Sequence, residues 1–256
     1  MKRPLLLPVG LLLLLGATRL CSQTPAAVAA FDTYTAQVES RLANQHRTPD
    51  AFLALNSTNR ARLRAGTPLI ENLTPPTQRS DVLIHHWRAT AFIPSATPAD
   101  FDRLLRDFSA YPQKFAPDIV SSTVLTRTPT DTLLRLRTRQ HHFITVILDT
   151  TCDVSFAALD PAHHYSISRS TRIDEITPGG DNGFLYRLNT YWAWEQRDGG
   201  LYIQLESLSL TRSIPHGLAW AVRPYLESIP RDSLIFTLTS ARNALRSNAS
   251  PLTPNP

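Results

Sequence analysis

The side chains best suited to chemistry in this sequence are two cations that stand among apolar residues. His85 alternates with apolar residues in the run Val82–Ile93, and Arg169 does so in the run Tyr165–Ile176. Alternation with a period of two places every second residue on one face of a β-strand. We therefore expect both side chains to point into an apolar interior, where an unpaired polar group is costly. Together they would hold the carboxylate or phosphate head group of a ligand.

The same two residues also have a purely structural interpretation. Arg169 would pair with an acid such as Asp149 or Glu175, and His85 would be a core histidine whose hydrogen bonds are satisfied. The register of the strands decides between the two interpretations, because a shift of one residue moves every side chain to the other face.

Adjacent histidines form a second set of candidates: His85-His86, His141-His142 and His163-His164. Histidine is a common zinc ligand, but neighbouring strand residues point to opposite faces, so at most one member of each pair would join a shared site. The sequence places no cysteine or carboxylate at a recognisable ligand spacing. It also has no glycine-rich phosphate loop and no nucleophile-elbow motif. We therefore expect neither a metal nor a cofactor.

The strands that would carry these residues are organised around a predicted hairpin from Phe184 to Arg212. Its centre, Arg197-Asp198-Gly199-Gly200, is typical of a two-residue turn, since Asp-Gly and Gly-Gly tolerate the positive φ angles required. Both arms alternate with one polar face, which predicts an antiparallel pair covered on one side only. The alternation changes phase at Leu208 and Leu210, which predicts a bulge near Ser207.

The segment from Ile214 to Leu245 is the candidate to cover the apolar face of this hairpin. Pro215 and Pro230 stand where a proline opens a helix, and Pro224 would kink the first piece. The second piece has an apolar stripe at helical spacing, formed by Leu234, Leu238, Ala241 and Leu245.

Upstream of the hairpin, strand signals follow one another with a single helix among them, which starts at Thr97-Pro98. Closely spaced strands without intervening helices predict an α+β fold with an antiparallel sheet of about seven strands. These strands are Val82–Ile93, Ile119–Arg127, Leu133–Arg139, Phe143–Phe156, Tyr165–Ile176 and the two arms of the hairpin.

This succession resembles the helix-grip fold of the START-like superfamily, also called SRPBCC or polyketide-cyclase-like. The resemblance covers residues 81–247 and implies a curved antiparallel sheet wrapped on the long C-terminal helix, with a deep apolar cavity between them. Members of the superfamily use this cavity for lipids, sterols, quinones or polyketides, and a few carry out chemistry there; the fold alone does not choose among these uses. The residues that carry the resemblance are Leu188-Asn189-Thr190-Tyr191-Trp192, the Asp198-Gly199-Gly200 turn, Glu206–Arg212, Ile214-Pro215, the stretch Phe115–Ser122 and the closing helix.

From this resemblance we predict a non-catalytic binding protein for a hydrophobic small molecule or lipid. An alternative is an enzyme of the cyclase or aromatase type, with His85 or a tyrosine as general base and Arg169 stabilising an enolate. Another is an interaction module of the cell envelope that docks helix 25–46 on a partner. The expected ligand-binding residues are His85, Trp87, Leu134, Arg169, Leu188, Trp192, Trp194, Ile203, Leu205 and Leu238.

The N-terminal residues 1–22 are predicted to be an export signal. Lys2 and Arg3 precede the short apolar run Leu5–Leu15, and small and polar residues follow, as in a secretory signal peptide. The protein would then be periplasmic or secreted. Cys21 leaves lipid attachment open as an alternative to simple cleavage near Ser22.

Residues 23–80 are predicted to be a helical arm followed by a linker. The arm would have one amphipathic helix that ends near His46 and a second helical stretch from Pro49 to Leu63. The proline-containing section Gly66–Ser80 is predicted to be a linker. Residues 248–256 are expected to form a disordered tail.

Charge and cysteine content limit the partners further. The chain has 26 Lys and Arg against 21 Asp and Glu, and removing the three basic residues of the leader leaves 23 against 21. A charge so close to zero does not favour a nucleic-acid partner; peripheral membrane association and the oligomeric state stay open. Without Cys21 only Cys152 remains, so the mature chain would form no internal disulfide, and Cys152 is expected to be a small buried hydrophobe.

Overall fold

The computed structural model describes residues 25–76, 83–141, 145–176, 185–211 and 219–249. The predicted leader, with Cys21, lies outside these ranges. The predicted hairpin is present as strands β7 (Leu185–Arg197) and β8 (Gly200–Thr211). Asp198 and Gly199 form its turn with φ angles of 57° and 74°, which this dipeptide tolerates. A Cβ atom on Gly200 would meet the carbonyl oxygen of Ile93 at 2.5 Å, so only glycine fits this position without a local shift.

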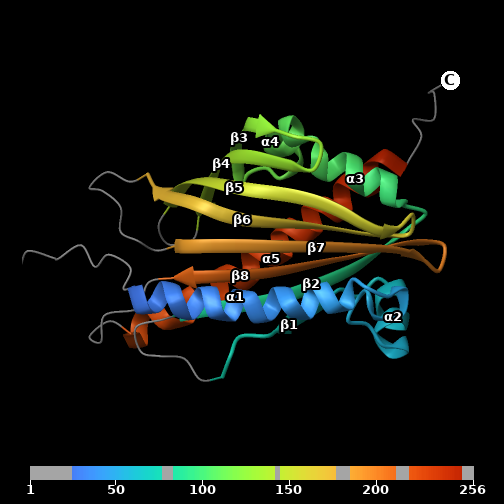
Figure 1. Ribbon diagram of the computed structural model, residues 1–256, viewed down its shortest axis with the longest axis horizontal. Coiled ribbons are helices and arrows are strands. Elements are labelled where there is room, and N and C mark those ends of the chain that lie inside the picture. Colours follow the sequence, from blue (N-terminus) through green and yellow to red (C-terminus); the bar gives the residue numbers. More distant parts are fainter. Residues whose placement is uncertain (1–24, 77–82, 142–144, 177–184, 212–218, 250–256) are drawn as a thin grey trace, which may run out of the picture.

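Strands β7 and β8 lie in the middle of an eight-stranded antiparallel sheet with the order β1-β2-β8-β7-β6-β5-β4-β3 (Figure 1). The strand β1 lies within the predicted linker, and Leu69 at its start pairs with Thr90 of β2. The α+β helix-grip prediction is confirmed, with this strand added to it. The remaining strands are β1 (Leu69–Asn72), β2 (Leu83–Pro94), β3 (Ile119–Arg127), β4 (Asp131–His141), β5 (Thr145–Asp160) and β6 (His163–Glu175).

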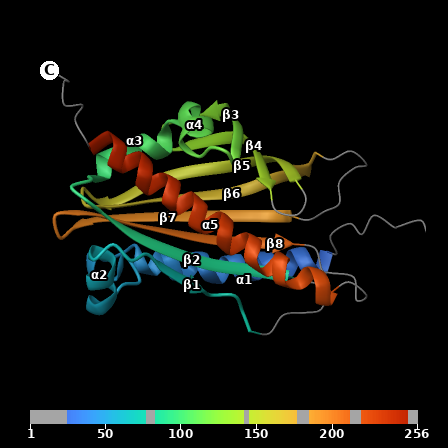
Figure 2. The ribbon, with the colours of Figure 1, turned by 180° about the vertical axis from the view of Figure 1, so that it is seen from behind.

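Helix α5 (Ala219–Ala249) crosses one face of the sheet, which we call the inner face (Figure 2). Its predicted apolar stripe is confirmed, since all four residues are buried in one core with Trp194 and Ile203. Pro224 and Pro230 both lie within this single helix, so the prediction that Pro230 opens a second helix is wrong. Packing of the stripe holds the helix together despite the backbone donor that proline lacks. Pro215 lies outside the described residues.

Short helices complete the inner side next to α5: α3 (Pro98–Arg106), η2 (Phe108–Ala110) and α4 (Tyr111–Lys114). The first of these begins with a capping box, in which Thr97 and Asp100 exchange side chain–backbone hydrogen bonds. Among the helices that the structure describes, none has the length and apolarity needed to span a membrane.

Helix α1 (Pro25–Gln45) covers the opposite, outer face of the sheet (Figure 1). Its apolar side packs against Leu208 and Leu210 of β8 and against Tyr191 of β7. Pairing of β8 with both neighbours continues without a shift from Ser207 into Leu208, so the predicted bulge is wrong. The prediction that one face of the hairpin is exposed to solvent is also wrong, because α1 buries the outer face. The buried residues of α1 are Ala27, Phe31, Val38 and Leu42.

The rest of the N-terminal arm also packs on the outer face, near the β7–β8 turn. It consists of η1 (Pro49–Ala51) and α2 (Ser57–Arg64). Leu63 of α2 lies in one buried cluster with Phe92 and Tyr202, and Arg60 binds the buried carboxylate of Glu195 at 2.9 Å. The apolar side of the arm is therefore used within the chain, which removes the docking surface that the interaction-module alternative required.

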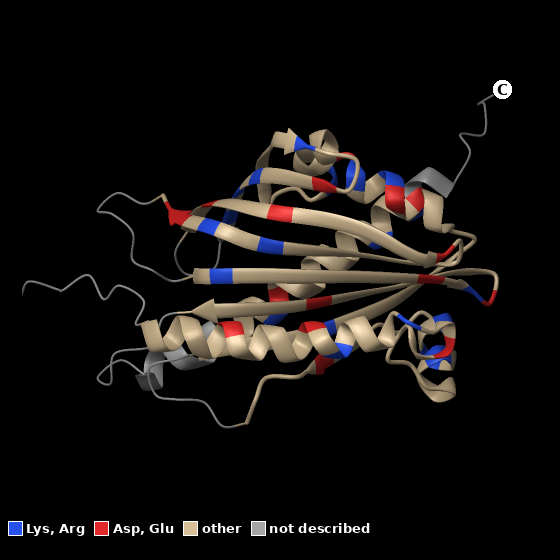
Figure 3. Ribbon diagram, viewed as in Figure 1, with Lys and Arg blue, Asp and Glu red and all other residues tan. Residues whose placement is uncertain are grey.

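A buried ion cluster fastens α1 to the sheet. Glu206 is 1% exposed; its Oε1 accepts a hydrogen bond from Arg41 of α1 and lies 2.7 Å from Nε2 of His86. Arg88 approaches the other carboxylate oxygen to 3.9 Å, and Tyr34 of α1 bonds Nδ1 of His86 at 2.9 Å. Burial acts to raise the pKa of Glu206, but the bond with His86 and the charges of Arg41 and Arg88 outweigh it and lower this pKa. Charges of both signs lie on α1 and on the outer face (Figure 3).

His46, just after α1, makes the stability of this packing dependent on pH. Its ring contacts those of Phe52 and Tyr165, at centroid distances of 4.7 and 4.4 Å. Burial, aided by the charge of Arg41, lowers the pKa of His46 from 6.5 to about 4. An unfolded chain therefore takes up this proton at a higher pH than the folded chain does. The resulting stability is present above pH 6.5 and is lost as the pH falls towards 4.

We expect the free energy of unfolding to be lower at about pH 5 than at about pH 7.5, and His46→Phe to reduce that difference. Phenylalanine keeps the aromatic contacts but does not titrate. Urea unfolding at the two pH values measures the effect, with His164→Phe as a control at a partly exposed histidine on the other face. Equal losses in the wild type and in His46→Phe would contradict the prediction.

Candidate ligand-binding site

A cavity of about 610 Å³ lies between the inner face of the sheet and the helices α3, α4 and α5. Its volume is within the usual range of small-molecule sites. Helix α5 closes it with Ile229, Pro230 and Leu234, and most of the remaining wall is apolar. These apolar residues include Leu105, Phe108, Tyr111, Phe115, Leu134, Leu136, Leu148, Val154 and Phe156.

The wall formed by β6, β7 and β8 differs, because a group of hydroxyl side chains lies there beside Leu188, Trp192 and Leu205. Thr190 of β7 lies opposite Ser168 of β6 and opposite Ser207 of β8. Directly opposed side chains on neighbouring strands have Cβ atoms about 5 Å apart, so these hydroxyls form a row across three strands. We call the whole set the hydroxyl cluster; it comprises Ser166, Ser168, Thr190, Ser207, Ser209 and Thr211.

His85 points to the inner face, as predicted. It lies opposite Ser209 in the β2–β8 pairing, and its Nε2 is 2.9 Å from Oγ1 of Thr211. Thr211 is among the residues that line the cavity, whereas His85 is not. His85 therefore positions one member of the hydroxyl cluster.

Four predicted binding residues line the cavity: Leu134, Leu188, Trp192 and Leu205. The other apolar ones lie beside it in the packed core of the inner face, where Phe101 of α3 meets Trp194 edge to face at a centroid distance of 5.1 Å. The core and the cavity wall are continuous on this face, so strand periodicity could not separate them. The residues placed in the packed core are Trp87, Trp194, Ile203 and Leu238.

The prediction that Arg169 points inward is wrong. Its guanidinium donates to both carboxylate oxygens of Glu39 in α1, at 2.6 and 2.9 Å. Its face of β6 resembles an inner face because α1 and the arm cover Ile167 and Tyr165 from outside. The structural interpretation, in which Arg169 pairs with an acid, is right, but that acid is Glu39 and not Asp149 or Glu175.

This placement bears directly on the enzyme alternative. That alternative required Arg169 to converge with His85 or with a tyrosine on one point within the cavity. The structure places Arg169 on the outer face of the sheet, paired with Glu39, so the proposed pair of a base and an enolate-stabilising cation does not form.

Three of the described histidines pair with carboxylates. His86 binds Glu206, His163 lies 2.8 Å from Asp160, and His164 lies 2.8 Å from Asp102. Within the ranges that the structure describes, no group of three or more His, Cys, Asp and Glu residues is arranged to hold a metal ion. His142 lies outside those ranges.

The rest of the wall has further polar side chains, including the hydroxyls of Thr138, Thr150, Ser233 and Thr237. Cys152 lines the cavity as a buried free thiol, and burial raises its pKa. The hydroxyl of Tyr111 donates to the carbonyl oxygen of Leu105 at 2.7 Å. Among the described residues of the lining, Asp118 has the only charged side chain.

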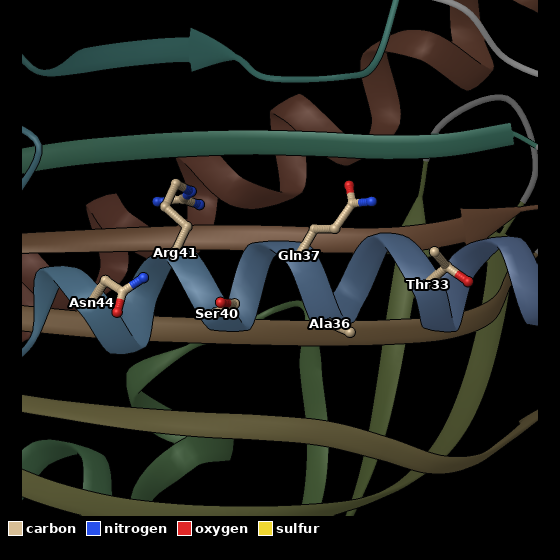
Figure 4. Close-up of a pocket in the computed structure, with 6 residues that line it drawn as sticks. All are labelled: Thr33, Ala36, Gln37, Ser40, Arg41 and Asn44. Carbon is tan, nitrogen blue, oxygen red and sulfur yellow. The ribbon is translucent and has the colours of Figure 1, made fainter.

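A second hollow lies on the exposed side of α1 (Figure 4). Its lining comes from one helix, none of these residues is buried, and Arg41 among them is engaged with Glu206. We therefore take the internal cavity as the candidate site. The residues of the hollow are Thr33, Ala36, Gln37, Ser40, Arg41 and Asn44.

No protein-family model matches this chain, and no curated protein matches its sequence. Solved structures do match. The protein TTHA0849 from Thermus thermophilus has a TM-score of 0.50 at 17% identity, covering 64% of this chain and 99% of its own. The ZhuI aromatase/cyclase from Streptomyces sp. R1128 has a TM-score of 0.50 at 14% identity, covering 67% and 99%. A STAR-related lipid transfer protein from Xanthomonas axonopodis has a TM-score of 0.49 at 17% identity, covering 69% and 98%.

Proposed function

We propose that this chain, which has the helix-grip fold of the START-like superfamily, is a non-catalytic binding protein for a hydrophobic small molecule or lipid. The observation that carries the proposal is the internal cavity of about 610 Å³ beneath α5. A ligand that fills it would bury most of its apolar surface, and this contributes about 25 cal/mol for each Å² removed from water.

The side chains on the wall support binding rather than a reaction. Aromatic and aliphatic groups provide contact area, and the hydroxyl cluster provides neutral hydrogen-bonding groups. His85 is engaged with Thr211, and Arg169 is paired with Glu39 outside the cavity. His85 therefore positions Thr211, and Arg169 helps to hold α1 on the sheet.

We also propose that the protein is exported, on the basis of the charged start and short apolar run in residues 1–22. The mass of the mature N-terminus tests this. Cleavage near Ser22 gives an unmodified shortened chain, and lipid attachment at Cys21 gives a heavier one. A mature protein that keeps Met1–Leu15 would contradict export by a cleaved signal.

The binding proposal predicts that the purified protein carries or takes up a lipophilic molecule. Native mass spectrometry after gentle purification should show an adduct that organic extraction releases. Nile red, a neutral apolar dye, should bind one per chain with a dissociation constant of about micromolar, as expected for a ligand of its size. A chain that yields no adduct and leaves Nile red emission unchanged would overturn the proposal.

A further inference from the structure

The hydroxyl cluster is an unusual feature for the inner face of an apolar cavity. Inward strand positions on the other side of the cavity are mostly apolar, with Leu134, Leu148 and Val154, and include only the separate hydroxyls of Thr138 and Thr150 among the described lining residues of β4 and β5. On β6 and β8 the corresponding positions hold Ser166 and Ser209, each only 4% exposed. A buried hydroxyl without a partner loses the hydrogen bonds that it would make in water.

Several of these hydroxyls are available to form hydrogen bonds with a ligand. Thr211 is bonded to His85, whereas Thr190, Ser207 and Ser209 make no side-chain hydrogen bond with another residue in the described part of the chain. Each hydroxyl supplies one donor and two acceptor positions. Since these residues line the cavity, a bound molecule is the partner they can reach.

The helical side of the cavity is aromatic. The rings of Phe108 and Tyr111 lie 5.3 Å apart, and those of Tyr111 and Phe115 lie 5.0 Å apart, in edge-to-face arrangements. Such rings favour contact with a flat ring system. The described lining of the cavity contains no Lys, Arg or His side chain that could neutralise an anionic head group.

We propose that the ligand is an uncharged ring compound with several oxygen atoms, and that the hydroxyl cluster determines this specificity. The inference rests on the proposed binding function and adds the class of ligand to it. Hydroxyls on neighbouring strands are spaced by roughly 5 Å, so the cluster can contact oxygen atoms at separate positions on one ring system. The aromatic side would hold the plane of the rings.

Displacement of Nile red by three related probes tests this proposal. Anthracene has three fused rings without oxygen, anthraquinone adds two neutral carbonyl groups, and anthraquinone-2-carboxylate adds a negative charge. In the wild type we expect anthraquinone to bind more tightly than either of the others. Ser207→Ala and Ser209→Ala should each weaken anthraquinone about fivefold, and the double variant more than tenfold, because each removes one hydrogen bond.

Anthracene provides the internal control, since its affinity should stay within about twofold in these variants. Ser40→Ala is the matched control for the substitution, because this serine lies on the exposed side of α1 (Figure 4). Thermal unfolding of each variant establishes that it is folded.

The possible results separate this inference from the function on which it rests. If anthracene and anthraquinone bind equally and the serine variants change neither, the cavity binds hydrophobic molecules but the assignment of the hydroxyl cluster is wrong. Tightest binding of anthraquinone-2-carboxylate would likewise overturn the uncharged class. Failure of Nile red itself to bind the wild type would overturn the proposed function and this inference together.

Discussion

Replacing Leu188 by tryptophan is expected to weaken binding of Nile red strongly while leaving the protein folded. Leu188 lies on the inner face of β7 and lines the cavity, where it is only partly buried. An indole at this position would extend into the cavity instead of displacing packed neighbours. We expect the affinity to fall at least tenfold, which corresponds to about 1.4 kcal/mol or more. The melting temperature should stay unchanged or rise, since filling a cavity commonly adds about 0.5–2 kcal/mol of stability.

Fluorescence titration and thermal unfolding measure the two parts of this prediction. Leu159→Trp is the control, because it makes the same substitution at an exposed position on β5 and should leave binding unchanged. Wild-type affinity in a folded Leu188→Trp variant would show that the dye binds elsewhere.

Replacing Glu206 by alanine should cause a large loss of stability, of about 3–5 kcal/mol. The carboxylate is buried among Arg41, His86 and Arg88. Its removal leaves positive charge next to the sheet without the compensating anion, and it releases Arg41 in the C-terminal part of α1. Burial makes this cost much larger than that of an exposed ion pair.

Urea unfolding at neutral pH tests this expectation. Asp174→Ala removes a surface ion pair with Arg172, in which the side chains of Arg172 and Asp174 are 73% and 41% exposed, and should change stability by less than about 1 kcal/mol. A Glu206→Ala variant that loses no more than Asp174→Ala would show that the ion cluster does not hold α1.

Local rules were sufficient to predict part of this fold from the sequence. The Asp198-Gly199 turn follows from the φ angles that these residues tolerate. The stripe of α5 follows from helical spacing, and Leu234 and Leu238 are buried as expected. With the order of strands, these features predict an α+β fold with an antiparallel sheet, and the resemblance to the START-like superfamily adds the helix-grip arrangement.

The orientation of β6 and β8 could not be predicted in the same way. Because α1 covers their outer faces, Ile167, Leu208 and Leu210 point away from the cavity although they are apolar. The inward positions of β6, and those of β8 after Leu205, hold serine or threonine where they line the cavity, so polarity alone assigns the two faces of these segments the wrong way round. The signal that could have corrected this was α1 itself, because an amphipathic helix requires an apolar surface to cover.

The N-terminal arm also determines when the fold can be completed during synthesis. Glu39 and Arg169 are 130 residues apart in the chain, and Arg41 and Glu206 are 165 residues apart. Helix α1 therefore docks on strands that are synthesised well after the helix itself, and β2 must likewise wait for β8. Contacts of such long range slow folding, so α1 stays without its native partner until β6, β7 and β8 have been made.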